Sequence, residues 1–270
     1  MDSHSFDTKR IADGYKNRPW LHPQVIEKIA QITGTDSFLH GLDVGCGAGL
    51  SARALKAICR EVTGTDISPE MIRVANEVCG NDPALTFFVS SAETIALDRP
   101  VDIVTAAGAI QWIDRTSFLQ NIASCMAEHG ILAVYDFSVS NRTVPGSPAH
   151  DSALSDISVP QNAYTRWWHE TYLPEFPKPC RNEHEWSNAD IKSFGFQFLC
   201  RETLNLTHSF DLDSFIEFML IQSNVNVQIE NGSKQIADVR KGFEKTLASV
   251  FQSGTITVIF TGYLWIMQKQ

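Results

Sequence analysis

The chain has 270 residues, 43% of them hydrophobic, and a formal net charge of −9 at pH 7. This length and composition allow one large domain with a full hydrophobic core. The acidic balance provides no basic stripe for phosphate contacts, so it disfavours a nucleic-acid partner.

Six cysteines occur without any C-x-x-C pair and mostly inside apolar runs. This pattern predicts reduced thiols and no metal site. The first residues lack the charged-then-apolar pattern of a signal peptide, and no apolar run approaches the length of a membrane span. We therefore expect a cytoplasmic protein with no membrane partner.

Residues 1–35 are expected to form an N-terminal helical cover, with a helix over residues 23–33. Before it lies the turn Tyr15-Lys-Asn-Arg18-Pro19-Trp20. In one interpretation the helix covers a sheet edge and Trp20 is its packing anchor. In the other, Tyr15 and Arg18 close over a bound ligand, Arg18 meets a carboxylate of that ligand, and Trp20 contacts a substrate.

The stretch Gly41-Leu-Asp-Val-Gly-Cys-Gly-Ala-Gly-Leu50 predicts a buried strand ending at Val44, a glycine-rich turn and a helix. Alternate glycines let the backbone approach a ligand, and the helix offers free N–H groups. Dehydrogenases use G-x-G-x-x-G around a pyrophosphate. Here the spacing is Gly45-x-Gly47-x-Gly49, and Asp43 would repel a pyrophosphate but attract an ammonium group. The turn therefore suits a zwitterionic, cationic cofactor.

A second acid follows the next strand, in Val62-Thr-Gly-Thr-Asp66-Ile-Ser-Pro69. Ser68 is the expected N-cap of the following helix, and Pro69 suits its first position. A carboxylate at this place can accept hydrogen bonds from both hydroxyl groups of a ribose. Asp66 thus favours an adenosine cofactor.

Together, Leu42-Asp-Val-Gly-Cys-Gly-Ala-Gly49 and the acid at position 66 resemble class I S-adenosylmethionine-dependent methyltransferases. The resemblance implies S-adenosylmethionine as the cofactor. It also implies cofactor contacts from both motifs, at Asp43, Gly45, Cys46, Gly47, Gly49, Asp66 and Ile67.

After the third strand comes Ser90-Ser91-Ala92-Glu93. The resemblance implies that Ser91 stands where this family has an acid that accepts the adenine amino group, with Ala92 beside it. A hydroxyl accepts this bond more weakly than a carboxylate does. For Glu93 we prefer ordinary helix capping.

After the fourth strand, small residues such as Ala107 leave room for the sulfonium methyl group and the homocysteine chain. Trp112 is expected to line the pocket, with some cation–π attraction to the sulfonium. The alternative is a tryptophan packed in the core. Gln111-Trp112 resembles relatives of trans-aconitate methyltransferase, which favours the pocket and places Gln111 against the substrate.

Residues 36–138 alternate strands and helices as a doubly wound parallel sheet requires. Strands are predicted over 40–44, 61–65, 85–89, 101–106 and 130–137, and helices over 50–59, 69–79, 92–96 and 116–127. The predicted fold class is α/β, a doubly wound, seven-stranded, mostly parallel Rossmann-like methyltransferase sheet with helical lid insertions. This segment is the cofactor-binding core of a single domain, and its ligands should lie beyond the carboxyl ends of the strands.

Residues 139–195 are rich in Ser, Pro, Asn and aromatic residues and predict a lid with a helix over 161–173. Trp168 and Tyr172 are expected to contact the substrate. A catalytic base, if one is needed, is best sought at His169, although a histidine beside tryptophans is more often a packing residue. Other histidines considered for this role are His129, His150, His184 and His208.

Residues 196–270 predict the last two strands, over 196–206 and 255–266, with inserted helices over 212–223 and 233–250. A short helix capped at Asn188 should precede them. These inserted helices are expected on the cofactor side.

The expected function is methyl transfer from S-adenosylmethionine to a carboxylate or hydroxyl group of an organic acid or secondary metabolite. A hydroxyl acceptor needs a base and a carboxylate does not. The alternative is a protein that keeps the cofactor pocket for a non-methylating role, as a cyclase or binding partner. A small-molecule acceptor is the expected partner, with a homodimer as a further candidate.

Overall fold

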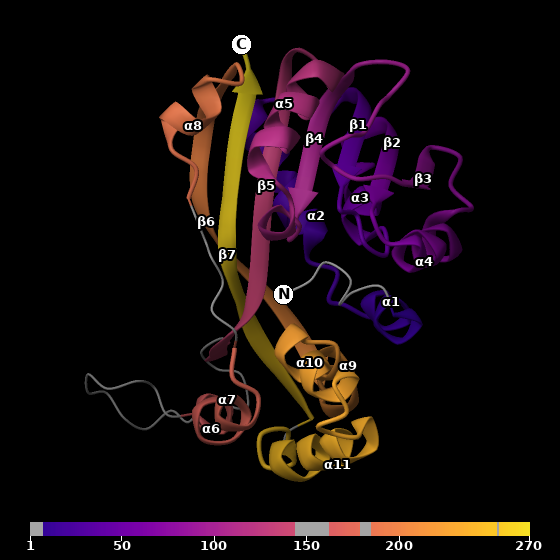
Figure 1. The fold of residues 1–270 in the computed structure, drawn as a ribbon. Helices are drawn as coiled ribbons and strands as arrows, with labels where there is room; N and C mark the ends of the chain where they lie inside the picture. Colours follow the sequence, from indigo (N-terminus) through magenta and orange to yellow (C-terminus); the bar gives the residue numbers. More distant parts are fainter. Residues whose placement is uncertain (1–7, 144–161, 179–184, 253) are drawn as a thin grey trace, which may run out of the picture.

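Figure 1 shows the computed structural model, which describes residues 8–143, 162–178, 185–252 and 254–270. Seven strands form one sheet in the order β3-β2-β1-β4-β5-β7-β6. Strands β1 to β5 pair in parallel, and β7 lies antiparallel between β5 and β6. The predicted fold class is therefore confirmed. The strands are β1 (Phe38–Val44), β2 (Cys59–Asp66), β3 (Leu85–Val89), β4 (Val101–Ala107), β5 (Met126–Thr143), β6 (Phe196–Asp211) and β7 (Thr255–Lys269).

Helices cover both faces of the sheet. On one face, α5 and α8 pack through Phe118, Leu119 and Ile191. On the other, α2, α3 and α4 pack through residues such as Ile29, Leu55 and Ala75. The helices of the core are α1 (Lys9–Tyr15), α2 (His22–Thr33), α3 (Leu50–Leu55), α4 (Pro69–Cys79), α5 (Arg115–Cys125) and α8 (Asn188–Lys192), with a 3₁₀ turn over Ile110–Trp112.

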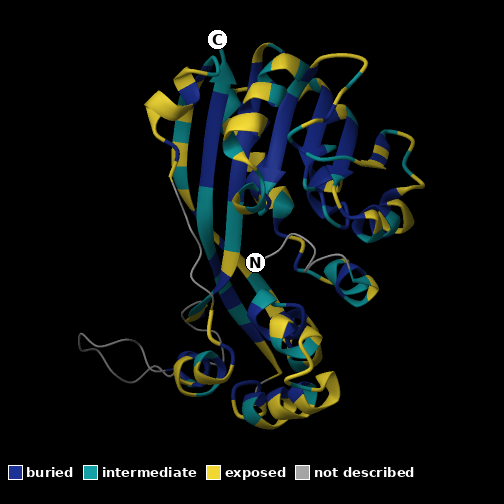
Figure 2. Cartoon of the chain, in the orientation of Figure 1, coloured by how far each residue is buried: buried dark blue, intermediate teal, exposed yellow. Residues whose placement is uncertain are grey.

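A second group of helices, which we call the distal lobe, gathers around the far ends of β5, β6 and β7 (Figure 1). These three strands continue well past the central sheet and carry the lobe. It comprises α6 (Ala163–Trp167), a π-helical segment (Trp168–Tyr172), α7 (Leu173–Glu175), α9 (Leu212–Leu220), α10 (Ser223–Glu230) and α11 (Ile236–Leu247). In Figure 2 the central strands are buried, whereas the helices expose one side to solvent.

The long strands differ from their predicted lengths. We expected β5 to end at residue 137, yet pairing with β7 continues from Ser138↔Thr261 to Thr143↔Val258. Residues 138–142 are mostly polar, so they lack the apolar alternation that marks a strand, and only the partner strand reveals them. The strand predicted over 196–206 likewise continues to Asp211.

Several helices also differ from prediction. Residues 92–96 form turns and loop rather than a helix, and α3 ends at Leu55. Helices α1 and α10 were not predicted. In α10, the run Ser-Asn-Val-Asn-Val has low helix propensity. The N-cap of α8 is Ser187, one residue before the predicted cap, and it forms a capping box with Asp190.

The division into a cover, core, lid and C-terminal part stays a prediction, and much of the lid segment lies outside the described residues. Across the described ranges, none of the helices combines the length and apolarity needed to cross a bilayer.

Candidate active site

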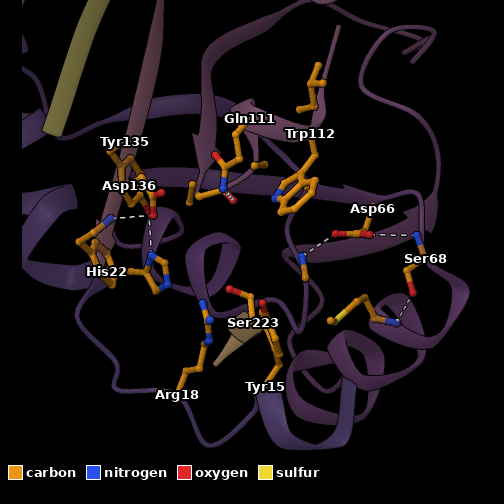
Figure 3. A pocket seen from close by; sticks show the side chains of 18 of the residues that line it. Tyr15, Arg18, His22, Asp66, Ser68, Gln111, Trp112, Tyr135, Asp136 and Ser223 are labelled. Atoms are coloured by element: carbon orange, nitrogen blue, oxygen red, sulfur yellow. Dashed lines mark hydrogen bonds between the residues drawn. The ribbon is translucent and has the colours of Figure 1, made fainter. Parts of the chain in front are cut away.

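A cavity of ≈ 490 Å³ lies beyond the carboxyl ends of β1, β2 and β4. This volume falls within the range of about 300–1,000 Å³ that small-molecule sites occupy. Its walls come from the glycine turn, the ends of β2, β4 and β5, the segment before α2, and the distal lobe. Figure 3 shows the cavity from close by.

The glycine turn forms one wall, where Gly45 and Gly47 have φ values of 63° and 52°. Only glycine adopts such angles without cost. The Asp66 carboxylate holds the turn in place, since it accepts hydrogen bonds from the backbone N–H groups of Gly47 and Ser68, each at 2.9 Å. Asp66 and Ile67 both line the cavity. The two predicted motifs are thus joined by one carboxylate.

Ser91, Ala92 and Glu93 continue the wall beyond Asp66. The Ser91 hydroxyl donates to the Glu93 carboxylate. That carboxylate also accepts a hydrogen bond from the backbone N–H of Asp114 at 2.9 Å. Glu93 therefore does not cap a helix as we expected, because no helix forms there, and it brings an acid to this wall of the cavity.

Arg18 is a positively charged residue in the cavity wall. Its guanidinium lies 4.1 Å from the centre of the Tyr15 ring, and both residues line the cavity. Nε of Arg18 is buried and has no hydrogen-bond partner among the described residues. No other lysine or arginine occurs among the described lining residues. A buried, unpartnered guanidinium N–H favours an anionic ligand group.

Ala107, Gln111 and Trp112 also line the cavity, as the sequence predicted. Gln111 donates from its amide nitrogen to the Gly108 carbonyl at 2.8 Å. In Figure 3 the Trp112 ring lies on the same side as Asp66 and Ser68. Their roles toward a ligand stay predictions.

The sequence did not single out His22, the first residue of α2, which lines the cavity next to Arg18 and Pro19. Its Nδ1 lies 2.9 Å from the hydroxyl oxygen of Tyr135. Burial and then the charge of Arg18 lower the pKa of His22 to about 3, so the imidazole is neutral at physiological pH. Burial raises the pKa of Tyr135 well above its usual value, which keeps the phenol protonated.

The second half of β5 contributes Asp136, Phe137 and Val139, and the distal lobe contributes Phe218, Gln222 and Ser223. None of these residues was assigned to the site. Asp136 and Phe137 end the strand predicted over 130–137, whereas the position of Val139 and of the lobe residues depends on the long β5–β7 pairing. In the sequence, only the β-branched and aromatic residues of the last strand indicate this pairing.

Three residues of the glycine motif lie behind the cavity rather than in its wall. Asp43 is fully buried and accepts hydrogen bonds from the hydroxyl groups of Ser51 and Thr105. Burial raises its pKa to about 6. The Cys46 side chain is buried, and Gly49 packs against Ala75 and Phe87. The predicted ligand contacts of Asp43, Cys46 and Gly49 therefore need correction, because these residues contact neighbouring protein groups and do not line the cavity.

The four lid and turn residues assigned to substrate or catalysis also lie elsewhere. Trp20 is 45% exposed and stacks on Arg53 outside the cavity. Trp168 and Tyr172 pack inside the distal lobe, with ring centres 4.8 Å apart, and the Tyr172 hydroxyl donates to Asn224. The His169 side chain is exposed, and its Nε2 lies 2.8 Å from Nδ2 of Asn141. Packing among aromatic rings, rather than ligand contact, explains the composition of this helix.

Of the other histidines, His208 contacts the Phe210 ring and His129 lies at the start of β5, and neither lines the cavity. His150 and His184 lie outside the described residues. Among the residues that the structure describes, no cluster of three or more histidine, cysteine or acidic side chains could hold a metal ion.

Comparison with known proteins gives a family match over residues 42–134, to the model described as methyltransferase domain. The chain is 31% identical to malonyl-[acyl-carrier protein] O-methyltransferase of Porphyromonas gingivalis, over 46% of this chain and 51% of that protein. It is 33% identical to trans-aconitate 2-methyltransferase of Methylobacterium radiotolerans, over 34% and 36%. The match thus spans about half, or less, of the length of these curated relatives.

Among solved structures, one from Anaeromyxobacter dehalogenans that is assigned as a type II methyltransferase has a TM-score of 0.64. The match covers 92% of this chain and 95% of that one at 18% sequence identity. At this identity the likeness concerns the fold alone, and it includes the distal lobe as well as the core.

Proposed function

Since residues 42–134 match the model of a methyltransferase domain, we propose that the protein transfers the methyl group of S-adenosylmethionine to a small organic acceptor. The acceptor group is a carboxylate or hydroxyl group of an organic acid or secondary metabolite. The supporting observation is the cavity lined by the Gly45–Gly47 turn, the Asp66 carboxylate and Arg18, whose Nε has no hydrogen-bond partner among the described residues.

The residues present fit this cofactor. Asp66, held by two backbone N–H groups, would accept hydrogen bonds from the ribose hydroxyl groups. Arg18 would pair with the carboxylate of the amino-acid part, because its Nε lacks a partner of its own. The Ser91–Glu93 pair, on the wall beyond Asp66, would face the adenine.

When bound, the cofactor supplies a methyl group on a sulfonium, which is already a good leaving group. The chain then has to align the acceptor and exclude water. The glycine turn, Arg18 and the distal lobe surround the cavity from different sides and perform these tasks.

The test is calorimetric titration with S-adenosylhomocysteine and with 5′-methylthioadenosine, which lacks the carboxylate and ammonium groups. Asp66→Ala should weaken both ligands by at least about 100-fold, since two hydrogen bonds of roughly 1.5–3 kcal/mol each are lost. Arg18→Gln should weaken only S-adenosylhomocysteine, by about 10- to 100-fold.

Asp98→Ala is the matched control, because it removes an exposed acid outside the cavity. Absence of S-adenosylhomocysteine binding to the wild-type protein would refute the proposal. Transfer of the labelled methyl group to an acceptor separates a methyltransferase from a protein that binds the cofactor for another purpose.

A further inference from the structure

The cavity has two chemically different ends (Figure 3). One, the ribose end, is formed by Asp66, Ser68 and Trp112. The other, the histidine end, is formed by His22, Tyr135 and Asp136. If the proposed function holds, the cofactor occupies the ribose end and reaches Arg18, so the histidine end remains for the acceptor.

An aromatic wall continues from His22 along the distal side of this end. The His22 ring lies 5.3 Å from the Phe137 ring, Phe137 lies 6.3 Å from Phe260, and Phe260 lies 5.6 Å from Phe218, between ring centres. All four residues line the cavity. Such a wall favours the burial of a flat, apolar molecule.

His22 provides one directed polar group on this wall. Its Nδ1 is held by the Tyr135 hydroxyl, while its Nε2 has no hydrogen-bond partner among the described residues. A hydroxyl group suits Nε2 in either tautomer, because a hydroxyl both donates and accepts hydrogen bonds. A carboxylate accepts only, and it suits one tautomer alone.

The charges at the cavity act against an anionic acceptor. Three carboxylates, of Asp66, Glu93 and Asp136, line the described part of the cavity, against the single cation Arg18. S-adenosylmethionine would add one carboxylate and two cationic groups, its ammonium and its sulfonium, so the described lining and the cofactor together would carry one net negative charge and would repel a carboxylate on the acceptor. An acceptor with several carboxylates would be poorer still, because each added charge lacks a partner.

We infer that the acceptor is an uncharged molecule with a flat apolar body and a hydroxyl group that binds Nε2 of His22, and not a carboxylic acid. The inference rests on the proposed function and narrows it to hydroxyl acceptors. In the transfer the methyl–sulfur bond would break as the methyl–oxygen bond forms, S-adenosylhomocysteine would leave, and the hydroxyl proton would pass to Nε2 of the neutral His22 imidazole. It gives His22 a direct substrate contact and makes Tyr135 its positioning residue.

The test uses the protein loaded with S-adenosylhomocysteine and the matched probes 2-naphthol and 2-naphthoate, measured by calorimetry. The naphthol should bind at least tenfold more tightly. His22→Phe, which keeps a flat ring and removes Nε2, should weaken the naphthol about tenfold and leave S-adenosylhomocysteine binding intact. Tyr135→Phe should weaken the naphthol less, because Nε2 remains.

Equal or tighter binding of the naphthoate, or unchanged naphthol binding by His22→Phe, would overturn the inference. Methyl transfer to the naphthoate would do so too, while leaving the proposed methyltransferase activity in place. Failure of S-adenosylhomocysteine to bind the wild-type protein would instead remove the proposed function itself, so the two failures are distinguishable.

Discussion

His22 is half-buried and Asp43 is fully buried, and the pKa values of these two titratable residues move in opposite directions. The pKa of His22 falls to about 3 through burial and the nearby Arg18. The unfolded chain has its histidine pKa near 6.5, so between these values it binds a proton that the folded protein does not. His22 therefore stabilises the fold above pH 6.5, and this contribution is lost as the pH falls.

Asp43 acts in the opposite sense, because burial raises its pKa from 3.8 to about 6. The folded carboxyl group keeps a proton that the unfolded chain has released, so its contribution is present at low pH and is lost as the pH rises toward 6. A pH titration of the wild-type protein alone would mix the two effects.

We therefore expect a difference between the wild-type protein and His22→Phe, which share Asp43. Between pH 7.5 and pH 5 the wild-type protein should lose about 2 kcal/mol more of its unfolding free energy than the variant. Urea unfolding at the two pH values measures this, with His169→Phe as the control that removes an exposed imidazole. A difference that stays constant with pH would show that His22 titrates normally.

Single residues also mark how far the sequence could be interpreted. Asp66, Arg18 and Trp112 are close in sequence to recognisable motifs, so their place at the cavity could be predicted. Asp43 belongs to the glycine motif, yet its carboxylate accepts hydrogen bonds from two hydroxyl groups inside the protein and does not line the cavity. His22 lies outside every motif, and only the fold of the turn before α2 brings it to the cavity.

Among the elements, α1 is tied to two neighbours by ion pairs. Asp13 pairs with Arg73 of α4 at 2.6 Å, and Arg10 pairs with Glu230 of α10 at 2.6 Å. Through these contacts the short helix bridges the core and the distal lobe, and it ends at Tyr15 beside the cavity. The side chains are about one-third exposed, so solvent screens the pairs.

We expect Arg73→Ala to change global stability by less than about 1 kcal/mol, as is usual for partly exposed pairs. It should instead loosen α1, raise amide exchange over residues 9–15, and weaken S-adenosylhomocysteine binding several-fold by releasing Tyr15 and Arg18. Arg99→Ala is the control, because it removes an exposed pair with Glu61 away from α1. Unchanged exchange in α1 would mean that packing alone holds the helix.

The elements of the core were predictable, whereas those of the distal lobe were less so. Alternating strands and helices with caps such as Ser68 specify β1 to β4 locally. Helix α10 and the polar part of β5 form only because partners pack against them, so propensity alone gave no sign of them. For the same reason the sequence did not predict Val139, which the extended part of β5 places at the cavity.

At the scale of the whole molecule, the family match over residues 42–134 confirms the resemblance to class I methyltransferases that the glycine motif predicted. The match ends in β5, before the distal lobe. The described lobe supplies the aromatic wall at the histidine end, through residues such as Phe218. The proposed acceptor end of the cavity is thus lined in part by residues that lie outside the matched family model.

Three strands run without interruption from the core into the distal lobe, which couples the stability of the two parts. Trp168 is 3% exposed and lies within the lobe's aromatic cluster, with Tyr172 at 4.8 Å and Tyr164 at 6.0 Å between ring centres. Truncation of a buried tryptophan costs about 3–5 kcal/mol. Because β5, β6 and β7 belong to both parts, this loss should lower the stability of the whole protein in one transition.

We expect Trp168→Ala to shift the urea midpoint measured by far-UV circular dichroism and the midpoint measured by tryptophan fluorescence by the same amount. Under conditions where the variant is folded, its affinity for S-adenosylhomocysteine should equal that of the wild-type protein, because Trp168 does not line the cavity. Trp20→Ala, at an exposed position, is the control and should leave the midpoints nearly unchanged. Two separate midpoints in Trp168→Ala would mean that the lobe unfolds independently of the sheet, despite the strands that they share.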